Sequence, residues 1–191
     1  MSGFQAVGLF LVSIFFTLVI FSLWLRIAIR FFRISAINPA SQIIYKITNP
    51  IVLPLNHIFN IEYKASNRYD WTTFAALVVV EFIKIIIVSL LVFGALIPFT
   101  FILVYVLADL IIQPCDLLFY IILIQVVLSW VSPTLQHPVL DVIRIITAPF
   151  LNFGRKIIPD ISGFDFSPFI ILIILKVITL FINHSLPWRL L

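Results

Sequence analysis

Long apolar runs separated by short polar segments dominate the sequence. The runs cover about residues 4–32, 72–93, 115–131 and 167–183. A helix needs about 20 apolar residues to cross the hydrocarbon core of a bilayer, and each run approaches or exceeds this length. The pattern therefore predicts an all-α membrane protein with four transmembrane helices.

The polar segment between the first two runs, residues 33–71, contains a helical pattern of its own. Asn38 followed by Pro39 is typical of a helix start. The isoleucines that follow recur at spacings of one, three and four, which places them on one face of a helix: Ile43, Ile44, Ile47 and Ile51. We expect an amphipathic helix that either lies on the inner leaflet or packs under the membrane bundle.

Residues 98–112 do not fit the regular alternation of runs and loops. Three structures are consistent with this segment: a further span, a re-entrant or interfacial helix, or the first part of one long tilted helix. The loop at 132–165 carries Arg144, Arg155 and Lys156, and basic loops tend to face the cytoplasm. Four crossings with both termini outside satisfy this bias. We therefore expect no additional crossing at 98–112, which leaves two alternatives: a re-entrant or interfacial helix, or the first part of one long tilted helix.

Composition supports a membrane protein and excludes other classes. Apolar residues make up 63% of the 191 residues and charged residues 10%, whereas soluble proteins have about 25% charged residues. This excludes a water-soluble globule and a disordered chain, and a single cysteine, Cys115, excludes a disulfide scaffold. The net charge of +4 comes from basic residues spread between apolar runs, which favours a topology signal over nucleic-acid binding.

The two halves of the chain resemble one another. Asn38-Pro39 and Thr48-x-Pro50 recur 99 residues later as His137-Pro138 and Thr147-x-Pro149. After a four-residue deletion, the segment that begins at Asp70 recurs 95 residues later at Asp165. Each half, 1–95 and 96–191, is thus predicted to contain a span, an amphipathic helix, a Thr-x-Pro turn, a polar loop and a second span. Since both loops face one side, the repeat is parallel.

The motifs of the second half resemble those of the YggT family of bacterial and plastid membrane proteins. The motifs in question are Leu128-Ser129-Trp130-Val131-Ser132-Pro133, Thr147-Ala148-Pro149-Phe150-Leu151, Arg155-Lys156-Ile157-Ile158-Pro159 and Gly163-Phe164-Asp165-Phe166-Ser167-Pro168. The resemblance covers the whole chain as two YGGT repeats. The first repeat departs from it, with Asn56-His57 where the family tends to have Arg-Arg and Thr72-Thr73 where it has Ser-Pro.

The resemblance implies a multi-pass protein of the bacterial inner membrane. Bacterial members are associated with osmotic stress tolerance or with envelope processes, and plastid relatives resemble assembly factors for haem attachment. We therefore expect a non-enzymatic scaffold or assembly factor for envelope proteins, without a cofactor. Its expected partners are the lipid bilayer, unidentified membrane proteins and further copies of the chain. The competing hypothesis is a small oligomeric ion channel or transporter that uses Glu81, Lys84 and Lys176.

These three ionisable residues lie inside predicted spans. Such residues are costly in a bilayer and usually face protein or water. Glu81 is nine residues after Thr72, and Lys176 is nine residues after Ser167, so the two lie at matching depth. We expect Glu81 and Lys176 to pair across the second and fourth spans, with Lys84 one turn away competing for Glu81.

The remaining candidates lie near the ends of the spans. We expect five basic side chains to contact anionic lipid headgroups or a partner protein, or to act only as topology signals: Arg26, Arg30, Arg33, Arg155 and Lys156. Asp70 and Asp165 precede spans and are expected to cap them. The three histidines have no metal-ligand spacing, and no catalytic motif is recognisable, so neither a metal site nor a catalytic site is predicted.

Overall fold

A computed structural model describes residues 3–59, 69–132, 136–158 and 165–187. Within these ranges the chain forms six helices: α1 (Gly3–Phe31), α2 (Pro39–Phe59), α3 (Trp71–Phe93), α4 (Phe99–Val131), α5 (Pro138–Ile157) and α6 (Ser167–Ser185). Four of them, α1, α3, α4 and α6, are long and apolar enough to cross a membrane. The predicted all-α architecture is therefore confirmed. Four residues of the second-half motifs lie outside the described residues: Pro133, Pro159, Gly163 and Phe164.

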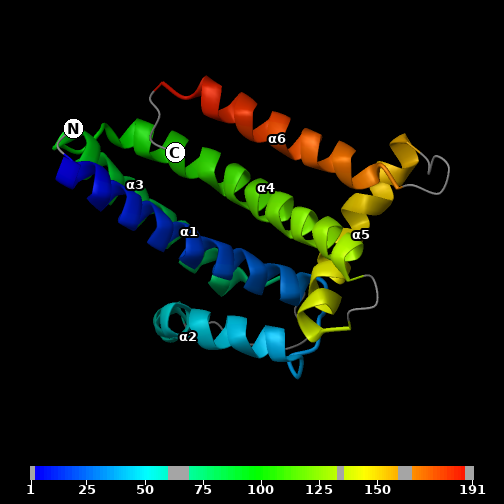
Figure 1. Ribbon diagram of the computed structural model, residues 1–191. Helices are drawn as coiled ribbons and strands as arrows, with labels where there is room; N and C mark the ends of the chain where they lie inside the picture. The colour runs from blue at the N-terminus through cyan, green and yellow to red at the C-terminus, as the bar shows by residue number, and fades with distance from the viewer. Residues whose placement is uncertain (1–2, 60–68, 133–135, 159–164, 188–191) are drawn as a thin grey trace.

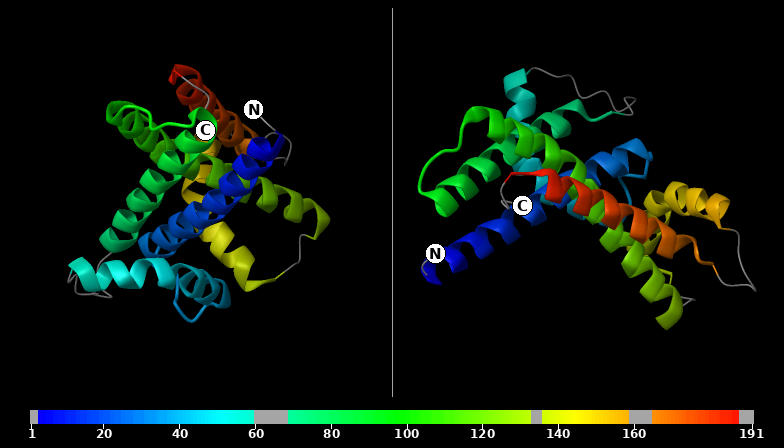
Figure 2. Two further views of the ribbon diagram at one scale, coloured as in Figure 1. Left: turned by 90° about the vertical axis from the view of Figure 1, so that its left-hand side faces the viewer. Right: turned by 90° about the horizontal axis from the view of Figure 1, so that it is seen from above.

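The four spans form one bundle, and the two amphipathic helices lie at the same end of it (Figure 1). α1 packs against α3, α4 packs against α6, and α3 and α1 both contact α4, as the two further views also show (Figure 2). α2 follows the end of α1, and α5 follows the end of α4. The two amphipathic helices meet near their starts, where the Asn38 amide donates to the Pro138 carbonyl at 3.3 Å.

Side chains cap the starts of both amphipathic helices. Asn38 Oδ1 accepts from the Ala40 N–H at 2.9 Å, and His137 Nδ1 accepts from the Val139 N–H at 3.2 Å. Such bonds satisfy N–H groups that have no partner within the helix. The residues that the repeat aligns at an offset of 99 thus have the same structural role.

The predicted apolar face of α2 does not point wholly into the bundle. Thr48 and Val52 are buried against α1 and α3, whereas Ile43 and Ile47 are 56% and 54% exposed. One side of α2 therefore packs against the spans while apolar side chains remain on its outer side. An apolar outer side is what a helix at the boundary of a leaflet requires.

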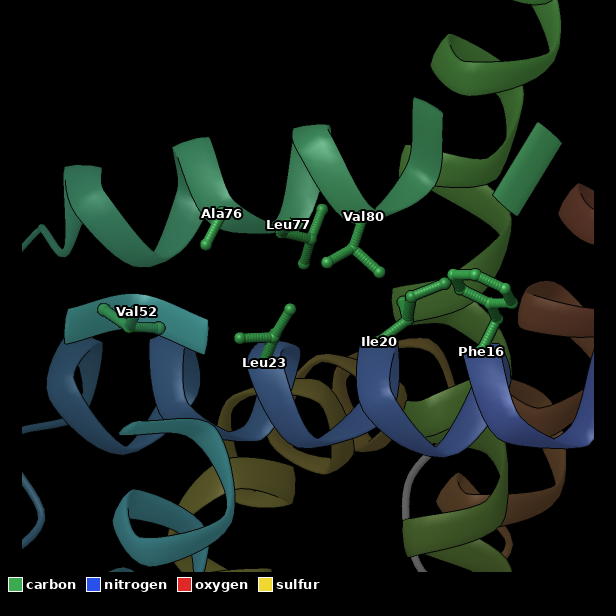
Figure 3. Close-up of a cluster of buried hydrophobic side chains, with 7 residues drawn as sticks. All are labelled: Phe16, Ile20, Leu23, Val52, Ala76, Leu77 and Val80. Carbon is green, nitrogen blue, oxygen red and sulfur yellow. The ribbon is translucent and has the colours of Figure 1, made fainter. Parts of the chain in front are cut away.

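The two halves have equivalent cores. In the first half, Leu23 of α1, Val52 of α2, and Ala76 and Val80 of α3 belong to one buried cluster (Figure 3). In the second half the positions 99 or 95 residues later form the corresponding cluster: Ile122, Leu151, Ile171 and Leu175. Because the same positions form both cores, each half folds as a span, an amphipathic helix and a second span packed together.

The structure distinguishes the alternatives left open at 98–112, and no separate re-entrant or interfacial helix forms there. Residues 99–131 form one continuous helix, α4, which is the third of the structures that the sequence allowed. Asp109 and Gln113 do not end the helix because both are buried against other parts of the bundle. Pro114 also lies inside α4, so the third span does not begin at 115.

The expectation that Pro50 and Pro149 form turns is also wrong. Both prolines lie inside helices, in α2 and α5 respectively. A proline inside a helix leaves one carbonyl without its N–H partner. Both prolines are on the exposed side of their helices, away from the spans, and the helices continue through them.

Candidate functional site

A fully buried cluster of charges joins α3 to α4. Lys84 forms an ion pair with Asp109, and its ammonium lies 3.8 Å from a carboxylate oxygen of Glu81. Gln113 also reaches Asp109, at 3.4 Å. None of the three charged side chains is more than 6% exposed. The cluster therefore lies within the protein and offers no surface to a partner.

The predicted pair of Glu81 with Lys176 is wrong. The Lys176 ammonium instead lies 3.7 Å from Asp116 of α4, on another part of the bundle. The two residues do lie at equal positions along equivalent helices, but they face different neighbours. Lys84, one turn along from Glu81, takes its place as the cation nearest that carboxylate.

The end of the first repeat where α2 and the start of α3 meet α1 contains a second buried cluster. Arg26 donates to Thr48 and Asn49 of α2, each at 2.8 Å, and its guanidinium lies 4.9 Å from the centre of the Tyr45 ring. Asp70 lies 3.2 Å from Arg30 and 3.7 Å from Arg26.

This arrangement corrects the expectation that Arg26 reaches lipid headgroups. Arg26 is only 3% exposed, because Thr48, Asn49 and Asp70 draw its guanidinium inward. Arg30 also turns toward Asp70. Asp70 itself accepts from the Thr73 N–H at 3.1 Å and caps α3 while holding the arginines.

The second repeat places different residues at the same positions. Gln125, 99 residues after Arg26, forms a hydrogen bond with Thr147, the equivalent of Thr48. Ser129 replaces Arg30 at the same offset. The guanidinium that reaches the equivalent aspartate comes instead from α5: Arg155 donates to Asp165 at 2.7 and 3.0 Å.

This second pair is open to the surroundings. The Arg155 side chain is 49% exposed and that of Asp165 31%. Asp165 also accepts from the Ser167 N–H at 2.8 Å, at the start of α6. Burial opposes the ionisation of Asp165, but hydrogen bonds from Ser167 and Arg155 outweigh this effect and lower its pKa below the usual 3.8.

Equivalent grooves lie beside the two aspartates. The groove of the first repeat, about 260 Å³, is lined almost entirely by apolar side chains: Ile27, Phe31, Tyr69, Trp71 and Phe74, with Asp70. The groove of the second repeat, about 340 Å³, has polar residues among its walls: Gln125, Ser129, Arg155 and Asp165, with Val126, Trp130, Leu151, Pro168 and Phe169. The first groove is apolar because its arginines are buried with Asp70, and the second keeps accessible donors and acceptors.

The other two basic residues predicted to contact headgroups or a partner, Arg33 and Lys156, lie at the surface. Lys156 is exposed in the last turn of α5. Arg33 is exposed just beyond α1 in the left-handed region, with φ 54°, where the Ile34 N–H bonds back to the Ile29 carbonyl at 2.9 Å. Such geometry commonly ends a helix.

Sequence reasoning missed four polar residues that have partners in the structure: Asp109, Asp116, Gln125 and Ser129. The repeat offset contained the signal for Gln125 and Ser129, since adding 99 to Arg26 and Arg30 gives their numbers. The two aspartates interrupt apolar sequence near lysines on other spans, but sequence alone does not pair them. Among the described residues, no group of three potential metal ligands lies together.

The spans, the two amphipathic helices and the equivalent cores define a tandem-repeat, multi-pass α-helical membrane protein. A family model described as CCB3/YggT matches residues 5–91 and 102–186, one segment for each half. The chain therefore belongs to the CCB3/YggT family, as its motifs predicted.

Curated relatives match over most of the chain. The uncharacterised protein YggT of Escherichia coli K12 is 30% identical over 174 residues, which cover 90% of this chain and 86% of the relative. An uncharacterised protein encoded in the proC 3′ region of Vibrio alginolyticus is 32% identical over 165 residues, or 86% of each chain. No solved structure matches the chain.

Proposed function

We propose that the chain is a non-enzymatic scaffold or assembly factor of the bacterial inner membrane that contacts other envelope proteins through the groove of its second repeat. The observation that carries the proposal is the difference between the two grooves. The first repeat buries its arginine–aspartate cluster, whereas the second leaves Arg155 and Asp165 exposed beside a polar groove. A groove with accessible charge-assisted donors and acceptors suits contact with a polar segment of a partner.

Charge supports an inward orientation for this groove. Arg144, Arg155 and Lys156 lie on α5, at the end of the bundle where Arg30 and Arg33 end α1. Basic residues accumulate on the cytoplasmic side of membrane proteins. The groove would then face cytoplasmic segments of envelope proteins, in keeping with the link to osmotic or envelope stress that the family resemblance implies.

The channel or transporter alternative has less support. It requires Glu81, Lys84 and Lys176 to line one polar path. Glu81 and Lys84 pack with Asp109 inside the α3–α4 contact, while Lys176 pairs with Asp116 elsewhere. The two pairings lie apart, so these residues do not line one polar path.

Site-specific photo-crosslinking in native membranes tests the scaffold proposal. A photoreactive residue at Ser129, in the groove, should give discrete adducts with other membrane proteins, whereas one at Phe10, on the exposed side of α1, should not. Arg155→Ala should remove the adducts and impair growth after osmotic shock in a strain that depends on this chain.

Three results would contradict the proposal. The first is an absence of groove adducts while the chain restores osmotic tolerance. The second is full activity of the Arg155→Ala variant. The third is passage of K⁺ or protons through the purified protein in liposomes, with Glu81→Gln altering the flux while the protein stays folded.

A further inference from the structure

A half-exposed ion pair lies midway along two of the spans. The Lys176 ammonium is 3.7 Å from the Asp116 carboxylate, and their side chains are 50% and 28% exposed. The same ammonium lies 5.5 Å from the centre of the Phe119 ring. The chain therefore leaves opposite charges partly uncovered on the outside of its bundle.

The depth of this pair makes its exposure significant. Lys176 follows Ser167 by nine residues in a helix of 19, so it lies about 14 Å into the span at ~1.5 Å per residue. This is close to the centre of a hydrocarbon core about 30 Å thick. Lysine near a helix end can extend its ammonium to the headgroups, but from the centre it cannot, and here Asp116 also holds it. Charges at this depth face protein or water.

The contrast with the other intramembrane cluster supports the same view. Glu81, Lys84 and Asp109 are almost completely covered by the chain itself. The fold thus buries one set of charges within the spans and leaves the side chains of the other set partly exposed. A second molecule packed against this face would bury the exposed pair.

Apolar side chains extend from the pair along one side of each helix. On α6 the most exposed residues recur at spacings of three and four on both sides of Lys176: Ile173, Val177, Leu180 and Phe181. On α4 an equivalent set follows Asp116: Tyr120, Leu123, Ile124 and Val127. Such spacings form continuous stripes that another pair of helices can pack against.

We propose that this face joins two copies of the chain about a two-fold axis, so that Lys176 of each copy reaches Asp116 of the other. A two-fold contact brings the same patch together from both sides, and the patch must be self-complementary. This one carries a single positive and a single negative charge, so two copies form a neutral group of four charges. An unrelated partner would need a matching acid and base of its own at the same depth. The proposed interface shares no residue with the lining of the groove beside Arg155, and its test does not depend on the scaffold function.

Disulfide trapping in liposomes tests the geometry. In a Cys115→Ala background, which removes the only native cysteine, Val177→Cys should give a disulfide-linked dimer on mild oxidation. Phe10→Cys, on the exposed side of α1, is the matched control and should remain monomeric. Equal cross-linking at both positions, or none at Val177→Cys, would overturn the proposal.

Charge exchange tests the pairing. Energy transfer between labelled copies at increasing lipid dilution should show that Lys176→Asp and Asp116→Lys each weaken association about threefold to thirtyfold, the range expected for polar contacts between spans. Mixing the two variants should restore association, because one copy then supplies two acids and the other two bases. If the mixed variants associate no more strongly than either variant alone, Lys176 and Asp116 do not pair between copies.

Two further measurements separate association from folding and from water access. Lys176→Met/Asp116→Leu removes both charges, so it should keep its helicity while associating as weakly as the single variants.

Lys176→Cys in the Cys115→Ala background should react with a membrane-impermeant thiol reagent far more slowly than Lys156→Cys on α5. Fast reaction would mean that the pair faces water, and a monomeric wild-type chain at every lipid ratio would equally rule out the dimer.

Discussion

Removing Lys84 should destabilise the protein more than any other loss of a single charge in the spans. Lys84 is the cation of a cluster that contains two carboxylates, Asp109 and Glu81, each 1% exposed or less. Lys84→Met leaves both carboxylates buried without their cation. Breaking a buried ion pair by removing one partner costs about 3–5 kcal/mol, a large share of the roughly 5–15 kcal/mol that stabilises a typical domain.

The companion variants follow from the same charge count. Lys84→Met/Asp109→Leu removes the principal pair together, so most of the lost stability should return. Glu81→Gln should be close to neutral or stabilising, because it removes the carboxylate in excess. Neither oxygen of Glu81 has a hydrogen-bond partner among the described residues, so little is lost.

Unfolding in mixed micelles of increasing SDS content, followed by circular dichroism, measures these differences. Lys46→Met, at an exposed position on α2, is the matched control and should unfold like the wild type. A Lys84→Met variant that unfolds within about 1 kcal/mol of the control, or a Glu81→Gln variant that loses as much stability as Lys84→Met, would contradict the buried-charge account.

Three further predictions use the same assay. Gly154→Ala should cost about 1–3 kcal/mol, because its new Cβ would lie 2.9 Å from the first residue of α6, whereas Gly8→Ala, with nothing within 4 Å, should cost far less. Asp70→Ala should cost about 3–5 kcal/mol by leaving buried arginines without their acid, and Asp165→Ala about 1 kcal/mol or less; equal costs would contradict the difference between the repeats. The lowered pKa of Asp165 means that its charged form stabilises the fold above pH 3.8 and that this contribution disappears as the pH falls through the lowered value. Asp165→Asn should therefore flatten the acid limb of the stability profile, and an unchanged limb would assign the acid sensitivity to other groups.

Hydropathy and spacing were sufficient to predict the number of spans, the amphipathic helices and the duplication, but not the residue at which the third span begins. These features depend on length, period and offset, which a sequence displays directly. The equivalence of Leu23 with Ile122 and of Val52 with Leu151 shows that the offset corresponds to real structural positions. The roles of Asn38 and His137 at helix starts could be read from position alone.

The charge partners could not be predicted in the same way. Depth along a helix follows from residue number, but the direction of a side chain around the bundle depends on how all the helices pack. Glu81 and Lys176 therefore share a depth without sharing a neighbour. Likewise, Asp109 and Pro114 are residue types that often end an apolar helix, so the sequence suggests a break there. In the structure Asp109 is buried in an ion pair with Lys84, and α4 continues through both residues.

The length of α4 makes the relation between the two halves sensitive to membrane thickness. Its 33 residues extend about 50 Å, so it must lean or project beyond a core about 30 Å thick. Its first half packs on α3 through Tyr105, and its second half packs on α5 and α6 through Ile122. A change in the tilt of α4 as the bilayer thins or thickens would therefore move α3 relative to α5 and α6, so α4 couples the positions of the two repeats.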